Sequence, residues 1–269
     1  MNLHQLFLTN NACYKAGVTM SPKGIMVHST GANNPWLRRY VGPDDGLLGT
    51  NSGGNHWNTL KPGGISVCVH AFIGKLADGT VATYQTLPWN MVGWHSGRGI
   101  KGSANNMGYI GFEICEDALG DPVYFSAVYQ EAVELCAMLC KEHGLDPATQ
   151  IICHSEGNTL GVASNHADVM HWFPRHGKNM DTFRAAVAAE IEDDMTKDQV
   201  IAIIKEHEAD KAATEPSDWS EEARTWAEGN GVIAGDGSGN MQYKSACTRE
   251  QMVVFLYRLF NLIKLLFGK

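Results

Sequence analysis

The sequence predicts an α/β domain with a mixed central β-sheet flanked by helices, followed by a small, mostly helical C-terminal module. Two patterns support this fold class. Short apolar runs rich in β-branched or aromatic residues alternate with helical segments in the N-terminal part of the chain. From Met195 the chain becomes acidic and helical, which is typical of a solvated linker. The 269 residues are therefore expected to form a domain at 1–194, an acidic helical linker at 195–216 and a module at 217–269.

Five segments of the first domain have the length and composition of β-strands. In order, they are GIMVHST (24–30), VCVHAFIG (67–74), TVATYQTL (80–87), YIGFEIC (109–115) and QIICHS (150–155). A long helix is expected over 125–144, because its apolar residues recur at helical spacing and Gly144 suits the end of a helix. A second helix is expected over 180–194, where it closes the domain.

Composition and charge exclude several classes of protein. The net charge of −8 argues against a nucleic-acid-binding protein. The N-terminal segment lacks a basic region and a long apolar stretch, so no secretory signal is expected and synthesis in the cytoplasm follows. The seven cysteines are odd in number and irregularly spaced, which favours free thiols. The apolar segment at 252–268 is shorter than a membrane span and contains Arg258 and Lys264, so it predicts a packed helix and no membrane span.

Polar residues at strand ends mark the candidate site. His28 ends the first predicted strand and His154 ends the fifth, and active sites of open α/β sheets lie at strand ends. Glu113 lies within YIGFEIC, where alternation places Phe112 and Ile114 on one face and Glu113 on the other. A buried carboxylate is costly unless it is paired. Glu113 therefore either has an Arg or Lys partner or faces a polar cleft.

These residues suit a zinc hydrolase, which needs three protein ligands, an open position for water and a nearby general base. His28 and His154 would supply two ligands, and Glu113 would supply the base. Several side chains could serve as the third ligand, namely Asp168, His166, His171 and Cys153. Cys153 is the weakest of them, because a strand points it to the face opposite His154.

The first domain contains five short motifs, which are VHST, WHSG, GYIGFEICED, CHSEG and SNHADVMHWF. Together they resemble the zinc-dependent N-acetylmuramoyl-L-alanine amidases of the peptidoglycan-recognition-protein and amidase-2 superfamily. The likeness covers roughly residues 1–190. It is greatest to the catalytic domains of phage and prophage endolysins. The resemblance implies the same kind of α/β fold, one catalytic Zn²⁺ ion and peptidoglycan as the substrate.

The resemblance also implies a role for each matching residue. It places the zinc ligands at His28, His154 and Asp168, and the general base at Glu113. Relatives often stabilise the oxyanion with a lysine two residues before the third ligand, and here that position is His166. Relatives commonly have Asp-Pro-Gly or Cys-Pro at the third ligand, whereas this chain has Asp168-Val169-Met170. The resemblance also places Trp94 and His95 in the substrate cleft. Independently of the resemblance, His70 in VCVHAFIG is a further candidate for the pocket.

The C-terminal module resembles a single S-layer homology repeat. The order Trp-Ala, Gly-Asp-Gly and Thr-Arg-Glu that marks this family is kept in the segment WAEGNGVIAGDGSGNMQYKSACTREQMVVFLYRL. Two residues differ from the family pattern: Met241 replaces the usual aromatic residue, and Tyr243 replaces the usual proline. The resemblance implies binding to a secondary cell-wall polymer. Because only one repeat is present, association with copies from other chains through the apolar faces of 251–267 is a further expectation.

The expected function is a peptidoglycan hydrolase that cleaves the amide bond between N-acetylmuramic acid and L-alanine of the stem peptide. It would be a phage or prophage endolysin, or a bacterial autolysin, acting on the cell wall after release from the cytoplasm. One alternative is a non-catalytic peptidoglycan-binding module, which typically lacks a zinc ligand, whereas this chain has a candidate for each one. The other is an amidase that recycles cytosolic muropeptides, against which the wall-type tail argues.

Overall fold

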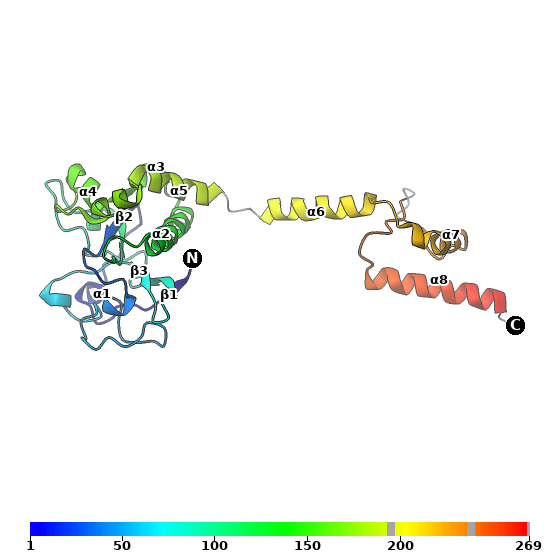
Figure 1. The fold of residues 1–269 in the computed structure, drawn as a ribbon, viewed down its shortest axis with the longest axis horizontal. Helices are drawn as coiled ribbons and strands as arrows, with labels where there is room; N and C mark the ends of the chain where they lie inside the picture. Colours follow the sequence, from blue (N-terminus) through cyan, green and yellow to red (C-terminus); the bar gives the residue numbers. More distant parts are fainter. Residues whose placement is uncertain (193–196, 236–239, 268–269) are drawn as a thin grey trace. The chain divides into compact units, whose positions relative to one another are not determined.

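A computed structural model describes residues 1–192, 197–235 and 240–267 (Figure 1). The chain divides into two compact units, Met1–Asp194 and Met195–Lys269. The first unit has the predicted fold class, a mixed central sheet flanked by helices, and the second is helical. The boundary expected near 195 adjoins residues 193–196, which lie outside the described ranges.

Six strands form one sheet in the order β1-β4-β3-β5-β2-β6. β3 and β4 pair antiparallel, and the other neighbouring strands pair parallel. The strands are β1 (Leu3–Gln5), β2 (Gly24–Ser29), β3 (Ala71–Lys75), β4 (Val81–Gln85), β5 (Tyr109–Ile114) and β6 (Ile151–Cys153). All five predicted strands are present. The additional strand, β1, has three residues and is too short to show a periodic pattern.

Helices and short 3₁₀ turns connect the strands. The helices of this unit are α1 (Ala12–Ala16), α2 (Pro122–His143), α3 (Pro147–Gln150), α4 (His154–Leu160) and α5 (Met180–Glu192). The 3₁₀ segments are η1 (Leu37–Arg39), η2 (Pro62–Gly64), η3 (Ala104–Met107), η4 (Asp168–His171) and η5 (Phe173–His176).

The longest helix, α2, has clear signals at both ends. Asp121 caps its N-terminus, because the Asp121 carboxylate accepts hydrogen bonds from the backbone N–H groups of Val123 and Tyr124. At the other end Gly144 adopts a left-handed conformation with φ of 65°, and its N–H donates to the Cys140 carbonyl. Gly144 is thus the predicted C-terminal cap, and the helix begins three residues earlier than the apolar spacing indicated.

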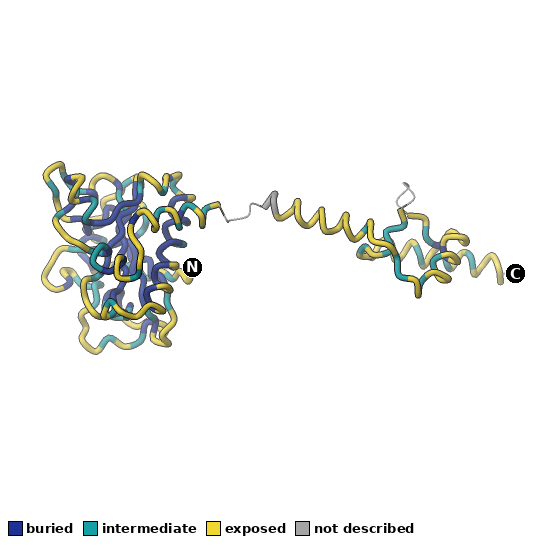
Figure 2. The backbone as a smooth tube through the Cα atoms, turned by 45° about the horizontal axis from the view of Figure 1, so that its top comes forward, coloured by how far each residue is buried: buried dark blue, intermediate teal, exposed yellow. Residues whose placement is uncertain are grey.

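The two faces of the sheet have different roles. Ile25 and Val27 of β2 point to the same side as Phe112 of β5, and on that side they join the main hydrophobic core with α2 and α5. Alternation therefore directs His28 and Glu113 to the opposite face. Figure 2 shows the buried residues, in dark blue, at the centre of this unit. The polar candidates consequently lie on the side of the sheet away from α2, at the carboxyl ends of β2 and β5.

The C-terminal unit consists of helices and turns. Its elements are α6 (Lys197–Ala213), η6 (Asp218–Ser220), α7 (Glu221–Gly229) and α8 (Arg249–Phe267). Thr248 and Gln251 cap α8 reciprocally: the Gln251 N–H donates to Thr248 Oγ1 (3.1 Å), and the Thr248 N–H donates to Gln251 Oε1 (2.8 Å). Within the described ranges, no helix has the length and apolar character that crossing a membrane requires.

Candidate functional site

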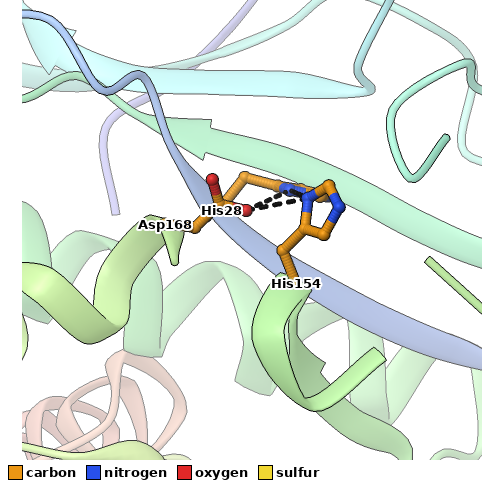
Figure 3. Close-up of side chains that lie close together, drawn as sticks. All are labelled: His28, His154 and Asp168. Atoms are coloured by element: carbon orange, nitrogen blue, oxygen red, sulfur yellow. Dashed lines mark hydrogen bonds and ion pairs between the residues drawn. The ribbon is translucent and has the colours of Figure 1, made fainter. Parts of the chain in front are cut away.

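His28, His154 and Asp168 converge from three separate elements (Figure 3). His28 lies near the end of β2, His154 begins α4, and Asp168 begins η4. Asp168 Oδ2 is 3.0 Å from His28 Nδ1 and 2.9 Å from His154 Nδ1. The two Nδ1 atoms are 3.1 Å apart. One atom from each side chain therefore points at a common centre, and both imidazoles are almost fully buried.

The position of His154 differs from the prediction, which placed it at the end of a strand. β6 ends at Cys153, and His154 is the first residue of α4. The helix begins here because the Cys153 N–H donates to the side chain of Glu156 at 3.0 Å, which satisfies a backbone donor at the helix start. Arg184 of α5 holds Glu156 in turn, with a closest contact of 3.1 Å. This chain of contacts fixes the backbone from which His154 projects.

Asp168 has an unusual backbone conformation, with φ of 45°. Aspartate tolerates this left-handed region better than most residues, yet strain of order 1–3 kcal/mol is typical and is found at functional sites. Burial alone would raise the pKa of the Asp168 carboxyl, but its close contacts with the imidazoles of His154 and His28 outweigh it and hold that pKa well below its usual range. Asp168 is therefore an anion that faces two imidazole nitrogens.

The other candidates for the third ligand lie elsewhere. His171 Nε2 is 3.1 Å from the buried carboxylate of Glu116. Cys153 belongs to the main hydrophobic core, on the α2 side of the sheet. His166 is exposed, and its ring centroid is 4.8 Å from that of His154. Within the described part of the chain, only His28, His154 and Asp168 form a group of three whose ligand atoms all lie within 4.8 Å of one another.

This donor set fits a zinc ion. Zinc binds histidine nitrogen and carboxylate oxygen at about 2.0–2.2 Å in a tetrahedron, which separates neighbouring ligand atoms by about 3.3 Å. The three separations of 2.9, 3.0 and 3.1 Å are close to that value. Two imidazoles and one carboxylate also match the ligand types of catalytic zinc sites.

Glu113 lies directly beside this group, because it is the register partner of His28 in the parallel pairing of β2 with β5. Its Oε2 atom is enclosed and has no hydrogen-bond partner among the described residues. Burial raises the pKa of the Glu113 carboxyl well above its usual range, and the negative charges of Asp168 and Glu116 raise it further. Of the two interpretations left open by the sequence, this environment favours a polar site over an Arg or Lys partner.

Ser164 links two of the histidines, and the sequence offered no signal for it. Its Oγ is 3.2 Å from His154 Nε2 and 3.1 Å from His166 Nδ1. Ser164 lies in the loop after α4, where no periodic pattern marks which side chains point inward. Its hydroxyl orients both rings at the rim of the candidate metal site.

The three residues expected in the substrate cleft have distinct surroundings. Trp94 is half-buried. His95 is 8% exposed, and its Nδ1 is 2.9 Å from His28 Nε2. His70 is fully buried: its Nδ1 accepts a 3.0 Å hydrogen bond from the Gly111 N–H, and its Nε2 is 2.7 Å from the Met91 carbonyl oxygen. Burial lowers the pKa of His70 to about 4, so the ring is neutral near pH 7.

Comparison with known proteins gives a family match that spans this site. The family described as N-acetylmuramoyl-L-alanine amidase, amidase-2, matches residues 18–174, a range that contains every residue of the candidate site. The chain is 34% identical over 151 residues to N-acetylmuramoyl-L-alanine amidase XlyA of Bacillus subtilis (strain 168), covering 56% of this chain and 43% of XlyA. It is 38% identical over 73 residues to N-acetylmuramoyl-L-alanine amidase CwlH of the same organism, 27% of each chain.

The chain thus spans less than half the length of these curated relatives. Among solved structures, the catalytic domain of XlyA is similar with a TM-score of 0.46 and 25% identity, over 70% of this chain and 99% of that one.

Proposed function

This chain belongs to the amidase-2 family of N-acetylmuramoyl-L-alanine amidases, and from that premise we propose that it cleaves the amide bond between N-acetylmuramic acid and L-alanine of bacterial peptidoglycan. The observation that carries the proposal is the convergence of His28, His154 and Asp168 beside the half-buried Glu113, whose Oε2 atom is enclosed. The enzyme would be an endolysin or autolysin that uses one zinc ion and reaches the cell wall after release from the cytoplasm.

Each residue of the site has a role in this reaction. His28, His154 and Asp168 would hold the zinc ion, which supplies Lewis-acid activation of the attacking water and of the scissile carbonyl. Glu113 accepts a proton from the attacking water and passes it to the leaving amine, as a general base and then a general acid. Its enclosed Oε2, which has no hydrogen-bond partner in the described part of the chain, is available for this proton. His166, at the exposed rim beside His154, donates a hydrogen bond to the developing oxyanion.

The substrate would enter from the open side of this group. The exposed His166 and the half-buried Trp94 are the candidates for contact with the glycan or the stem peptide. An aromatic ring such as Trp94 offers a large apolar face, which suits a sugar or a peptide backbone. The almost fully buried His95 and His70 would act on the substrate only through neighbouring residues.

Digestion of purified peptidoglycan tests the activity. The full chain, with and without a chelator, is incubated with sacculi, and the products are identified by mass spectrometry. Stem peptides with free L-alanine amino termini, absent when chelator is present, are expected. New reducing sugar ends, or no products with zinc present, would contradict the proposal. Binding without products would instead indicate a peptidoglycan-binding module. Cleavage of soluble muropeptides but not of sacculi would indicate a recycling amidase.

For the C-terminal unit we propose self-association through one face of α8. Apolar side chains follow each other at alternating intervals of three and four residues, which is the spacing of a coiled-coil seam. Their exposed fractions are 65, 59, 56, 47 and 82% for Val253, Leu256, Phe260, Ile263 and Phe267. Five consecutive seam positions are thus exposed within this unit, and a second copy of α8 would cover them.

A different face of α8 contacts the rest of its own unit. Phe255, Leu259 and Leu262 are half-buried, and Arg258 on the same face donates to the Val232 carbonyl (3.4 Å). Charge favours an antiparallel pair, because Glu250 and Lys264 flank the seam on one side. Pairing Leu256 with Phe260 of the other copy would bring Glu250 of each copy near Lys264 of its mate.

Sedimentation velocity on the full chain tests this association. Leu256→Glu should shift the protein to monomer, whereas Leu265→Glu, a change of the same kind at an 81% exposed position off the seam, should not. A monomeric wild-type protein at high concentration would rule the pairing out. The exposed Cys247 reports orientation, because an antiparallel pair places the two thiols at opposite ends. The implied affinity for a secondary cell-wall polymer is tested with walls from which that polymer has been extracted.

A further inference from the structure

We propose that His95 is a positioning residue that sets the hydrogen-bonding state of the zinc ligand His28. The inference rests on the proposed metal site and assigns His95 a structural connection to it, through His28, in place of a contact with substrate. Three observations support it: a directional chain of hydrogen bonds, the burial of His95, and a space on β5 that only glycine leaves open.

The hydrogen-bond chain begins at a backbone carbonyl. His95 Nε2 is 3.1 Å from the Tyr109 carbonyl oxygen, which can only accept, so Nε2 carries the hydrogen. In a neutral imidazole the other nitrogen is then an acceptor. His95 Nδ1 therefore accepts from His28 Nε2, 2.9 Å away. As a zinc ligand, His28 would offer its Nδ1 lone pair to the centre shared with His154 and Asp168, and a neutral His28 ring then carries its hydrogen on Nε2, where His95 Nδ1 accepts it.

The burial of His95 keeps this chain directional. The side chain is 8% exposed, and the rings of His28 and His70 lie at centroid distances of 5.0 and 5.9 Å. Its described hydrogen-bond partners include no carboxylate. The two ring nitrogens of His95 thus have the Tyr109 carbonyl and His28 as their described partners, one on each side of the ring.

Two features fix the ring in place. The backbone N–H groups of His95 and Ser96 both donate to Asn105 Oδ1, at 3.1 and 2.9 Å. The ring also lies directly against the backbone of Gly111 in β5: a Cβ atom there would be 2.4 Å from His95 Cγ. A separation under 3.0 Å is not tolerated, so any side chain at position 111 would displace the ring. The glycine that precedes Glu113 by two residues thus makes room for His95.

This arrangement has a clear chemical use. Histidine ligands of metals commonly donate their second N–H to a carbonyl or carboxylate, which fixes the ring and raises its basicity, and loss of such a partner typically lowers metal affinity by about 10–100-fold. In this protein His95 is the partner of His28. Its Nε2–H donates to the Tyr109 carbonyl, which leaves Nδ1 to accept from His28 Nε2.

Zinc affinity tests the inference without substrate. The full-length protein and its variants compete for zinc against a chromophoric chelator. His95→Leu, which removes the acceptor, should weaken zinc binding by about 10–100-fold. His95→Asn, whose side-chain oxygen can replace Nδ1 as acceptor, should restore most of that loss. His70→Gln is the matched control, because His70 is also buried but none of its described hydrogen bonds reaches a proposed ligand.

A second measurement reports the hydrogen-bonding state itself. Nitrogen NMR of the zinc-loaded protein with ¹⁵N-labelled histidine should show His95 with its proton on Nε2 and a protected His28 Nε2–H that is absent in His95→Leu. A proton on His95 Nδ1, or equal zinc affinity of wild type and His95→Leu, would overturn the inference while leaving the proposed amidase intact. A wild-type protein that binds no zinc would overturn both.

Discussion

Replacing Glu113 with glutamine should have opposite effects on activity and on stability. The carboxylate is proposed to accept a proton during catalysis, yet it is held in an enclosed position where Oε2 has no partner among the described residues. Glu113→Gln keeps the size of the side chain and removes its charge. The variant should therefore lose the general base and, at the same time, relieve the folded protein of a buried charge.

The two effects differ in size. Loss of a general base slows a reaction by about 10²–10⁴-fold. A buried polar group without a partner destabilises a protein by about 1–3 kcal/mol, and more when it is charged. We expect Glu113→Gln to raise the free energy of unfolding of the zinc-free protein by at least about 1 kcal/mol at pH 7. In a domain of this size, that corresponds to an increase in melting temperature of about 2–4 °C.

The pH dependence follows from the direction of the pKa shift. Because burial raises the pKa of Glu113 above its value in the unfolded chain, the charged form destabilises the fold at pH values above the folded-state pKa. This penalty diminishes as the pH falls and the folded protein takes up a proton. The stability advantage of Glu113→Gln over wild type should therefore shrink as the pH is lowered toward the unfolded-state pKa.

The assay combines peptidoglycan turnover with thermal unfolding in chelator, for wild type, Glu113→Gln and the control Glu142→Gln. Glu142 is a carboxylate of α2 that is 52% exposed, so its replacement should change neither quantity appreciably. Retained activity within tenfold of wild type would show that Glu113 is not the base. A lowered melting temperature would show that its carboxylate has a stabilising partner, and the reasoning from burial would then be wrong.

Three further predictions concern the surroundings of the site. Burial lowers the pKa of His70 to about 4, so wild type should lose on the order of 3 kcal/mol of unfolding free energy as the pH falls from about 6.5 to 4. In denaturant titrations across that range, His70→Gln should show a flatter dependence of unfolding free energy on pH. Removing zinc from the native protein should lower its melting temperature, because a ligand at 100 times its Kd adds about 2.7 kcal/mol to the free energy of unfolding. Equal melting curves with and without chelator would contradict a bound metal. Gly111→Ala should weaken zinc binding, because the alanine Cβ would lie 2.4 Å from His95 Cγ and displace that ring. Unchanged zinc affinity in the chelator competition would show that the His95 ring can move without affecting the metal site.

Local patterns predicted the strands that carry the site. Alternation in YIGFEIC placed Phe112 and Glu113 on opposite faces, and in the structure Phe112 joins the main core while Glu113 is the register partner of His28. The start of α4 at His154 was missed, because it depends on the side chain of Glu156, held by Arg184 from a distant helix. Such contacts leave no periodic trace in the sequence.

The surroundings of the histidines were also beyond reach of local patterns. The contact between His95 and His28 joins residues 67 positions apart, and it depends on a loop without regular structure resting against a glycine of β5. Ser164 likewise lies in a loop, between two rings that only the folded chain brings together. Residue types can suggest which chemistry is possible, whereas long-range packing decides which nitrogen of each ring is available for it.

The wide separation of the proposed ligands along the chain has a practical consequence. His28 comes from β2, whereas His154 and Asp168 follow β6, and β2 pairs with both β5 and β6 in the finished sheet. A partly synthesised or partly folded chain cannot assemble this pocket, since metal affinity depends on all three donors being in place. The molar ratio of zinc to protein in a purified sample would therefore measure the fraction of molecules that have reached the native state.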